Sequence, residues 1–259
     1  MSERPVDPAA AQGFAQNAAE YERARPSYPA DAVACIIGRA RIAPGKRVVD
    51  LAAGTGKLTR LLVPSGAEVV AVEPVDAMRD QLAAVLPDVE MHDGTAESLP
   101  FPDQTVDAIT VGQAFHWFDP EPALREMGRV LRPGGCLVLT WNTRDRSHDW
   151  VREFGELLVD GDLARPYDNY YDVDYASVVA EAGGYTPLQT FETTWEQPAD
   201  TELLVARAAS VSVVGALPDD ERAVVLERVR TFCHTHPQLA GRDGFGFPYR
   251  TRVFWCHRA

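Results

Sequence analysis

The chain has 259 residues, of which 46% are hydrophobic and 24% are charged, and this composition is ordinary for a globular protein with a buried core. No apolar run is long enough to cross a bilayer, and the N-terminus lacks the basic-then-apolar pattern of a secretion signal. The formal net charge of -13, from 25 basic and 38 acidic residues, disfavours a nucleic-acid partner, whose phosphates need clustered Lys and Arg.

The first half of the chain alternates helix and strand patterns. An amphipathic helix is predicted over residues 30–41, and further helices over 55–63, 76–86 and 120–131. Short apolar runs predict buried strands at 47–52, 68–73, 89–93, 106–113 and 136–142, the last delivered by a turn at Pro133-Gly134-Gly135. Strands alternating with helices predict a mainly parallel sheet with helices on both faces.

The second half changes character. Residues 143–176 are polar and rich in Tyr, Asp and Arg, and only a helix at 150–159 is predicted there. A helix at 176–182 precedes a strand at 188–197, further helices are predicted near 200–214 and 218–233, and the alternating C-terminal segment predicts a last strand. The pattern therefore predicts about seven strands in one sheet, with insertions before the sixth and seventh.

The stretch "RVVDLAAGTGKLTRLL" places a glycine turn between a strand and a helix, and three ligands compete for it. A nucleotide-binding P-loop fails at two positions, because Leu58 follows Gly56-Lys57 and Leu51 stands where the first glycine belongs. A dinucleotide turn lacks its third small residue, because Thr59 occupies that position. S-adenosylmethionine has no phosphate, so the turn needs only to bring the backbone close to the amino-acid part of the cofactor.

The next strand supplies the acid that such a cofactor needs. Glu73 ends "VVAVE", and a carboxylate there would accept both ribose hydroxyls through charge-assisted hydrogen bonds worth roughly 1.5–3 kcal/mol each. Open α/β sheets bind ligands at the carboxyl ends of their strands, where the turn, Glu73, Thr95 and Gln113 would all lie. This favours S-adenosylmethionine as the cofactor and leaves NAD as a weaker alternative.

Four stretches in order now show a family resemblance: "VVDLAAGTGKLTRLL", "VVAVEPVDAMRDQL", "DGTAESLPFPDQTVDAITVGQAFHWFD" and "EMGRVLRPGGCLVLTWN". Together they cover about residues 45–142 and resemble the successive motifs of class I S-adenosylmethionine-dependent methyltransferases. Two further stretches, the Phe, Tyr and "RPSYP" within residues 14–29 and "QAFHWFD", resemble the trans-aconitate methyltransferase-like branch.

The resemblance implies a single Rossmann-like domain over 1–259. Residues 1–44 would be an N-terminal helical cover, 45–142 the cofactor-binding half, and 143–176 with 198–240 lid or substrate insertions. It also implies roles at the cofactor. Asp50 begins the first motif, Glu73 holds the ribose, and Gln113 faces the methionine group. Apart from the resemblance, the expected role of Asp50 is to brace the turn by accepting backbone amides. The remaining implied cofactor residues are Tyr21, Arg25, Ala52, Ala53, Gly54, Gly56, Pro74, Met78, Thr95, Ala96 and Glu97.

Two positions depart from the family pattern. The family often has "GCG" where this chain has "AAG", and Ala52 still offers its backbone carbonyl. The family often has an Asp where this chain has Thr95, whose uncharged side chain would contact the adenine amine more weakly. Met78 fits an adenine contact and plain core packing equally well.

His116 is the candidate catalytic residue, because it follows the fourth strand near the expected methyl donor. It would act as a general base on the acceptor, or instead hydrogen-bond the substrate or a backbone carbonyl. The substrate would contact side chains near it, and the dense tyrosines would form either a lid or a surface loop. These candidates are Phe115, His116, Trp117, Trp141, Tyr167, Tyr170 and Tyr171.

No metal site is expected, because His234 and His236 have no acid or Cys partner at ligand spacing. No CxxC pair exists among the cysteines, which favours a reducing cytoplasm over a disulfide scaffold; they are Cys35, Cys136, Cys233 and Cys256.

The expected function is transfer of a methyl group from S-adenosylmethionine to a small molecule, such as a carboxylate or a natural product, leaving S-adenosylhomocysteine. Three alternatives stay open at this point. They are a non-methylating reaction of a cofactor-binding protein with the same fold, a NAD-linked oxidoreductase, and a non-catalytic scaffold. Neither the oligomeric state nor the acceptor follows from the sequence.

Overall fold

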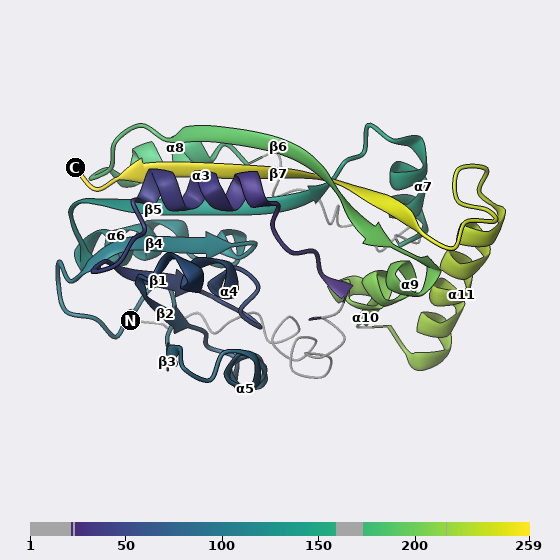
Figure 1. Cartoon of the computed structure of the whole chain (residues 1–259), viewed down its shortest axis with the longest axis horizontal. Helices are drawn as coiled ribbons and strands as arrows, with labels where there is room; N and C mark the ends of the chain where they lie inside the picture. Colours follow the sequence, from purple (N-terminus) through teal and green to yellow (C-terminus); the bar gives the residue numbers. More distant parts are fainter. Residues whose placement is uncertain (1–21, 23, 159–172, 216) are drawn as a thin grey trace. The chain divides into compact units, whose positions relative to one another are not determined.

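The structure is a computed structural model, and it describes residues 22, 24–158, 173–215 and 217–259. The chain divides into two compact units (Figure 1). Of the described residues, the sheet unit holds 27–142, 173–193 and 251–259. The helical unit holds residues 22, 24–26, 143–158, 194–215 and 217–250.

A seven-stranded sheet forms the framework, in the order β3-β2-β1-β4-β5-β7-β6. Pairing is parallel from β3 through β2, β1 and β4 to β5. The last strand runs antiparallel to β5, because Gly134 bonds Arg258 whereas Thr140 bonds Arg252. This confirms the predicted mainly parallel, Rossmann-like sheet. The strands are β1 (Arg47–Leu51), β2 (Glu68–Val72), β3 (Glu90–His92), β4 (Val106–Gly112), β5 (Leu131–Arg144), β6 (Gln189–Ala199) and β7 (Phe245–His257).

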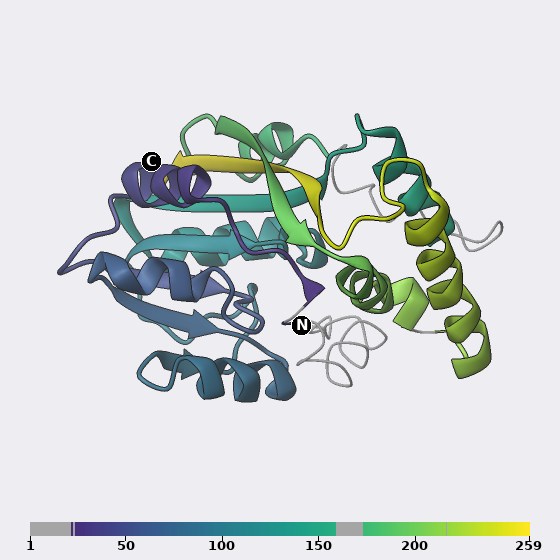
Figure 2. The same cartoon turned by 45° about the vertical axis from the view of Figure 1, so that its right-hand side comes forward.

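Helices cover both faces of the sheet within the sheet unit. On one face, Ile36 and Leu62 pack with strand residues such as Val48 and Ala108 in one buried cluster. On the other face, the Tyr185 hydroxyl donates to Leu124 O at 2.7 Å. Figures 1 and 2 show α3 on the first face and α6 with α8 on the second. These helices are α3 (Ala30–Ala40), α4 (Thr59–Leu62), α5 (Asp76–Val85), α6 (Pro120–Val130) and α8 (Tyr175–Ala182).

Two predicted boundaries near the sheet are wrong. The helix predicted at 55–63 begins only at Thr59, because the preceding residues form the turn after β1. The strand predicted at 136–142 begins at Leu131. Leu131 pairs with Val106 and Cys136 with Ala108, so the residues between them bulge out of the ladder. The predicted turn at Pro133-Gly134-Gly135 is therefore a bulge inside β5.

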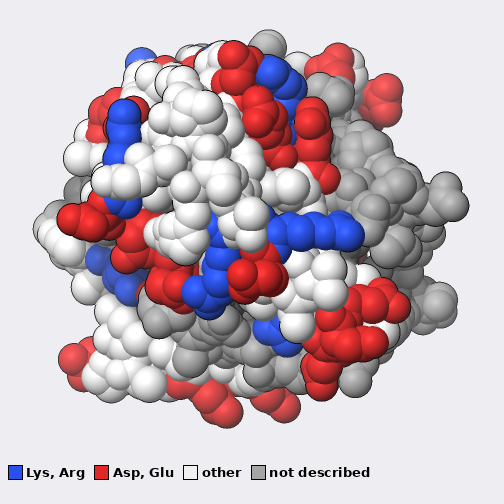
Figure 3. Space-filling model, turned by 90° about the vertical axis from the view of Figure 1, so that its right-hand side faces the viewer, with Lys and Arg blue, Asp and Glu red and all other residues white. Residues whose placement is uncertain are grey.

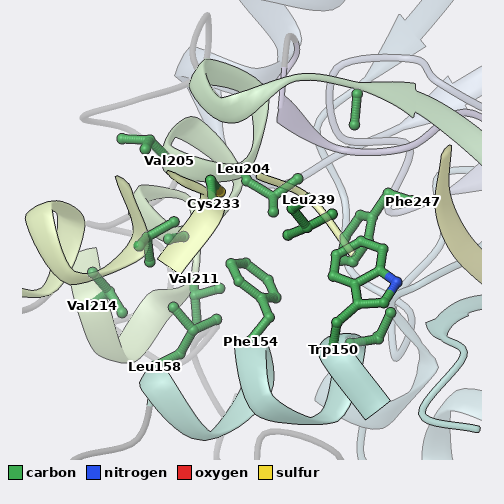
Figure 4. Close-up of a cluster of buried hydrophobic side chains, with 14 of the residues drawn as sticks. Trp150, Phe154, Leu158, Leu204, Val205, Val211, Val214, Cys233, Leu239 and Phe247 are labelled. Atoms are coloured by element: carbon green, nitrogen blue, oxygen red, sulfur yellow. The ribbon is translucent and has the colours of Figure 1, made fainter. Parts of the chain in front are cut away.

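The helical unit has a core of its own, in which aromatic and aliphatic side chains from its helices meet the ends of β6 and β7 (Figure 4). Phe154 of α7 is fully buried there and makes an edge contact with Phe247, with ring centroids 5.6 Å apart. Arg230 of α11 pairs with Glu202 of α9. The helices are α7 (Asp149–Leu157), α9 (Thr201–Ala209), α10 (Ser212–Gly215) and α11 (Asp219–Thr235).

Acidic and basic side chains intermingle on the face shown in Figure 3, and the described part of that face carries no broad basic area. The expectation that the chain does not bind nucleic acid stays a prediction. Among the described residues, no helix has the length and apolarity needed to span a membrane.

Candidate active site

The carboxyl ends of β1, β2 and β4 meet at one edge of the sheet. Leu51 at the end of β1 pairs with Val72 on β2 and with Val111 on β4. The residues that follow, Ala52, Glu73 and Gly112, are therefore level with one another. Because ligands of open α/β sheets bind at this edge, the register brings the predicted turn and acid to the expected place.

Three of the five residues in the turn Ala52–Gly56 have left-handed backbone conformations. The φ angle is 53° at Ala52, 58° at Gly54 and 82° at Gly56. A Cβ on Gly56 would lie 3.0 Å from Leu82 Cγ, so the turn packs closely onto α5. A Cβ on Gly54 would meet no atom within 4 Å. The backbone at Gly54 is therefore open to a ligand, whereas Gly56 is required by packing.

Glu73 links this turn to the start of α5. Its Oε2 accepts from the Gly54 N–H at 2.8 Å, and its Oε1 accepts from the Val75 N–H at 3.0 Å. Only 6% of its surface is exposed, and this burial raises the pKa of the carboxyl above its usual value. A carboxylate has about four acceptor positions, so two stay available for ligand hydroxyls. The Arg79 guanidinium donates to Glu73 O at 2.6 Å and holds the backbone there.

Asp50 braces the turn from inside the sheet. Its carboxyl accepts from the Thr59 hydroxyl at 2.6 Å and from the Thr110 hydroxyl at 2.8 Å. The residue is 1% exposed, and burial raises the pKa of its carboxyl from 3.8 to about 6. Asp50 thus ties α4 to β4 beneath the turn. So little of Asp50 is exposed that it could touch a ligand over only a very small area. Its implied place in the cofactor site stays a prediction.

Gln113 follows β4 directly and has a backbone conformation that is unusual for a residue with a side chain. Its φ angle is 61°, in the left-handed region. Its N–H donates to Thr140 O at 2.9 Å, and its side-chain Nε2 donates to Asn142 O at 3.0 Å. These bonds hold the strained backbone, and such strain is common where a residue serves a ligand.

The residues predicted to surround the adenine lie in the sheet unit after β2 and β3. Met78 and Ala96 are buried and Pro74 is half-buried. Thr95 forms an isolated bridge with Ser98. Glu97 Oε1 accepts from the Asp119 N–H at 3.1 Å, which anchors the start of α6. Their contacts with an adenine stay predictions.

Aromatic side chains follow β4 and lie near the end of β5. The short helix η2 (Phe115–Trp117) carries three of the predicted substrate residues. Trp141 is buried and its ring stacks on Tyr175 at a centroid distance of 4.4 Å. The Trp141 Nε1–H faces His116 Nδ1 at 3.5 Å, a long contact that favours the tautomer with the proton on Nε2. Trp117 is 46% exposed.

The described part of the sheet unit does not include several of the predicted site residues. Tyr21, Tyr167, Tyr170 and Tyr171 lie outside the described residues. Arg25 belongs to the helical unit, where its guanidinium donates to Ser210 O at 2.7 Å. The roles implied for all of them stay predictions.

The structure adds polar residues that sequence reasoning missed. Thr59 and Thr110 bind Asp50, and Asn142 connects β5 to other segments. When a hydroxyl or amide side chain lies within an apolar run, the neighbouring sequence does not indicate which distant residue it will hydrogen-bond. Tyr28 and Gly112 were also missed, although Tyr28 lies within the quoted "RPSYP" segment.

Comparison with known proteins identifies the family. A family model described as a methyltransferase domain matches residues 49–139. An uncharacterised methyltransferase of Mycobacterium tuberculosis is 42% identical over 239 residues, which is 92% of each chain.

Two solved structures share the fold. One is an Anabaena variabilis protein provisionally assigned as a methyltransferase of an antibiotic biosynthesis pathway, with a TM-score of 0.63, 24% identity and coverage of 89% of this chain and 98% of that one. The other is geranyl diphosphate methyltransferase in complex with S-adenosylmethionine, with a TM-score of 0.50, 14% identity and coverage of 88% and 85%. With its motifs, sheet and relatives taken together, this chain belongs to the class I methyltransferase family.

Proposed function

We propose that this chain binds S-adenosylmethionine at the carboxyl ends of β1, β2 and β4 and transfers its methyl group to a small molecule. The observation that carries the proposal is the pairing of Glu73 with the Gly54 N–H beside an open backbone at Gly54. Family membership supports methyl transfer, and the fold is one in which a solved relative holds this cofactor.

The residues present fit the cofactor. The two acceptor positions left on the Glu73 carboxylate would take the ribose hydroxyls, each bond contributing roughly 1.5–3 kcal/mol. The backbone of Ala52–Gly56 would follow the methionine part, with Gln113 on its other side. Pro74, Met78 and the segment 95–97 would border the adenine.

The chain contributes mainly position. When bound, S-adenosylmethionine would supply a methyl group on a positively charged sulfur; the methyl group would go to the acceptor, and S-adenosylhomocysteine would be the other product. Holding the acceptor in line with that methyl group is worth roughly 7–11 kcal/mol of the barrier. His116 would serve the acceptor either as a base or, with its proton on Nε2, as a hydrogen-bond donor to an acceptor oxygen.

Two acceptor classes are favoured. The resemblance to the trans-aconitate methyltransferase-like branch supports a carboxylate acceptor, which suits an Nε2–H donor at His116. The likeness to the Anabaena protein supports a specialised natural product, though only at the level of the fold.

Calorimetric titration tests the cofactor. The wild type is expected to bind S-adenosylmethionine and S-adenosylhomocysteine but not NAD. Glu73→Ala should lose binding by tenfold or more, since it removes about 1.5–3 kcal/mol per ribose bond. Glu68→Ala is the matched control. Glu68 is the first residue of β2, at the end of the strand away from Glu73, and it pairs with Arg47. Binding of NAD alone would favour the oxidoreductase alternative.

Product mass tests the reaction. Incubation with S-adenosylmethionine and a panel of carboxylates and natural products should yield a product heavier by one methylene unit, together with S-adenosylhomocysteine. A product of unchanged mass formed only with bound cofactor would instead indicate a non-methylating reaction. Cofactor binding without any turnover over the panel would favour the scaffold alternative.

A further inference from the structure

The Tyr28 side chain contacts the end of β4 at Gly112, where the absence of a Cβ makes room for it. A Cβ placed on Gly112 would lie 2.5 Å from the Tyr28 hydroxyl oxygen and 3.4 Å from its ring carbon Cζ. Cβ atoms essentially never approach another atom that closely. The backbone of Gly112 is not left-handed, so its conformation does not require glycine. The position requires glycine because a Cβ would occupy the place of the Tyr28 hydroxyl.

This hydroxyl lies beside the end of β4, level with the start of the proposed cofactor turn. Gly112 is the last residue of β4 and pairs with Thr140 on β5. On the other side it is level with Ala52, because Val111 pairs with Leu51. Gln113, with its left-handed backbone, follows directly. The Tyr28 side chain is therefore directed to the carboxyl edge of the central strands.

The backbone beside Tyr28 is fixed to the same strand ends. The Asn142 amide donates to Ser27 O at 2.8 Å and accepts from the Thr251 hydroxyl at 2.5 Å. Its backbone carbonyl accepts from the Gln113 side chain at 3.0 Å. These bonds hold Ser27 to the ends of β4 and β5, so the adjacent Tyr28 ring is positioned before any ligand binds.

We propose that the Tyr28 hydroxyl binds the amino-acid end of the adenosyl cofactor, an inference that rests on the proposed function. That end carries a carboxylate and an ammonium group. A phenol donates to the first or accepts from the second, and either bond involves a charged partner. Tyr28, in the segment before α3, would thus hold the methionine part of the cofactor against the turn.

The test compares cofactor binding in single-hydroxyl variants. Tyr28→Phe should raise the Kd of S-adenosylmethionine and S-adenosylhomocysteine about tenfold to a hundredfold, as expected for a hydrogen bond to a charged group. The Kd of 5′-methylthioadenosine, which lacks the amino-acid end, should stay unchanged. Tyr185→Phe is the matched control, because it removes the hydroxyl that binds Leu124 O on the other face of the sheet.

The outcomes separate this inference from the proposed function. If the wild type binds no adenosyl ligand, the proposed function fails first. If the wild type binds and Tyr28→Phe binds equally well, the role of Tyr28 is wrong. Equal weakening of all three ligands would also overturn it, because the hydroxyl would then act through the fold of the pocket.

A second pair of variants tests the geometry without any ligand. Gly112→Ala should lower the melting temperature, because its Cβ would overlap the Tyr28 hydroxyl. Combining it with Tyr28→Phe should restore most of the loss, since the nearest remaining ring atom lies at 3.4 Å. If Gly112→Ala does not fold alone, the double variant should still fold. A double variant as unstable as the single one would place the Tyr28 hydroxyl elsewhere.

Discussion

Replacing the titratable Asp50 with Asn should change how the unfolding free energy of this protein depends on pH. The Asp50 carboxyl is buried, and its pKa is raised from 3.8 to about 6 in the folded protein. Between these values the folded state binds more protons than the unfolded state. The free energy of unfolding that Asp50 contributes is therefore fully present below pH 3.8 and is lost as the pH rises through about 6.

The magnitude follows from the pKa difference. A shift from 3.8 to about 6 is about 2 pH units, which corresponds to roughly 3 kcal/mol. Asp50→Asn removes the titration and keeps a side chain that can accept from one threonine hydroxyl and donate to the other. The difference in unfolding free energy between the Asn variant and the wild type should therefore rise by about 3 kcal/mol between pH 4 and pH 7.

Urea unfolding followed by circular dichroism at several pH values between 4 and 7.5 measures this difference. Asp107→Asn is a control with the opposite sign. The Asp107 pKa is lowered although burial opposes this, because Asp107 accepts from the Arg47 N–H and from the Lys46 and Arg132 side chains. Its contribution to stability is present above the unfolded pKa and is lost as the pH falls. A pH-independent difference for Asp50→Asn would refute the reasoning.

Three further predictions concern single side chains. Gln113→Ala should lower stability by about 1 kcal/mol more than Gln113→Gly, because both lose the bond to Asn142 but only glycine relieves the φ of 61°; equal values in denaturant unfolding would contradict this. Phe154→Ala should cost roughly 3–5 kcal/mol in the same assay, whereas Val224→Ala, at a site 53% exposed, should change little. If His116 is a base, His116→Ala should reduce turnover about 10²–10⁴-fold with cofactor affinity intact, and a loss under about tenfold rules that role out.

The sequence alone supports the strand and helix order and the place of the turn that we propose for the cofactor. Apolar runs and helical periodicity are local patterns, so seven strands in a mainly parallel sheet were predictable. The left-handed turn at Gly54 and Gly56 and the acid Glu73 also follow from neighbouring residues, and the register brings them together as predicted.

Only the tertiary structure decided which side chains meet across the sheet. The bulge within β5 depends on the pairing of Leu131 and Cys136 with β4, which no local pattern reveals. The contact of Trp141 with His116 and the approach of Tyr28 to Gly112 join residues far apart in sequence. Such contacts arise because strand order and register are set by the packing of the whole sheet, whereas a sequence pattern reports only on the faces of one element at a time.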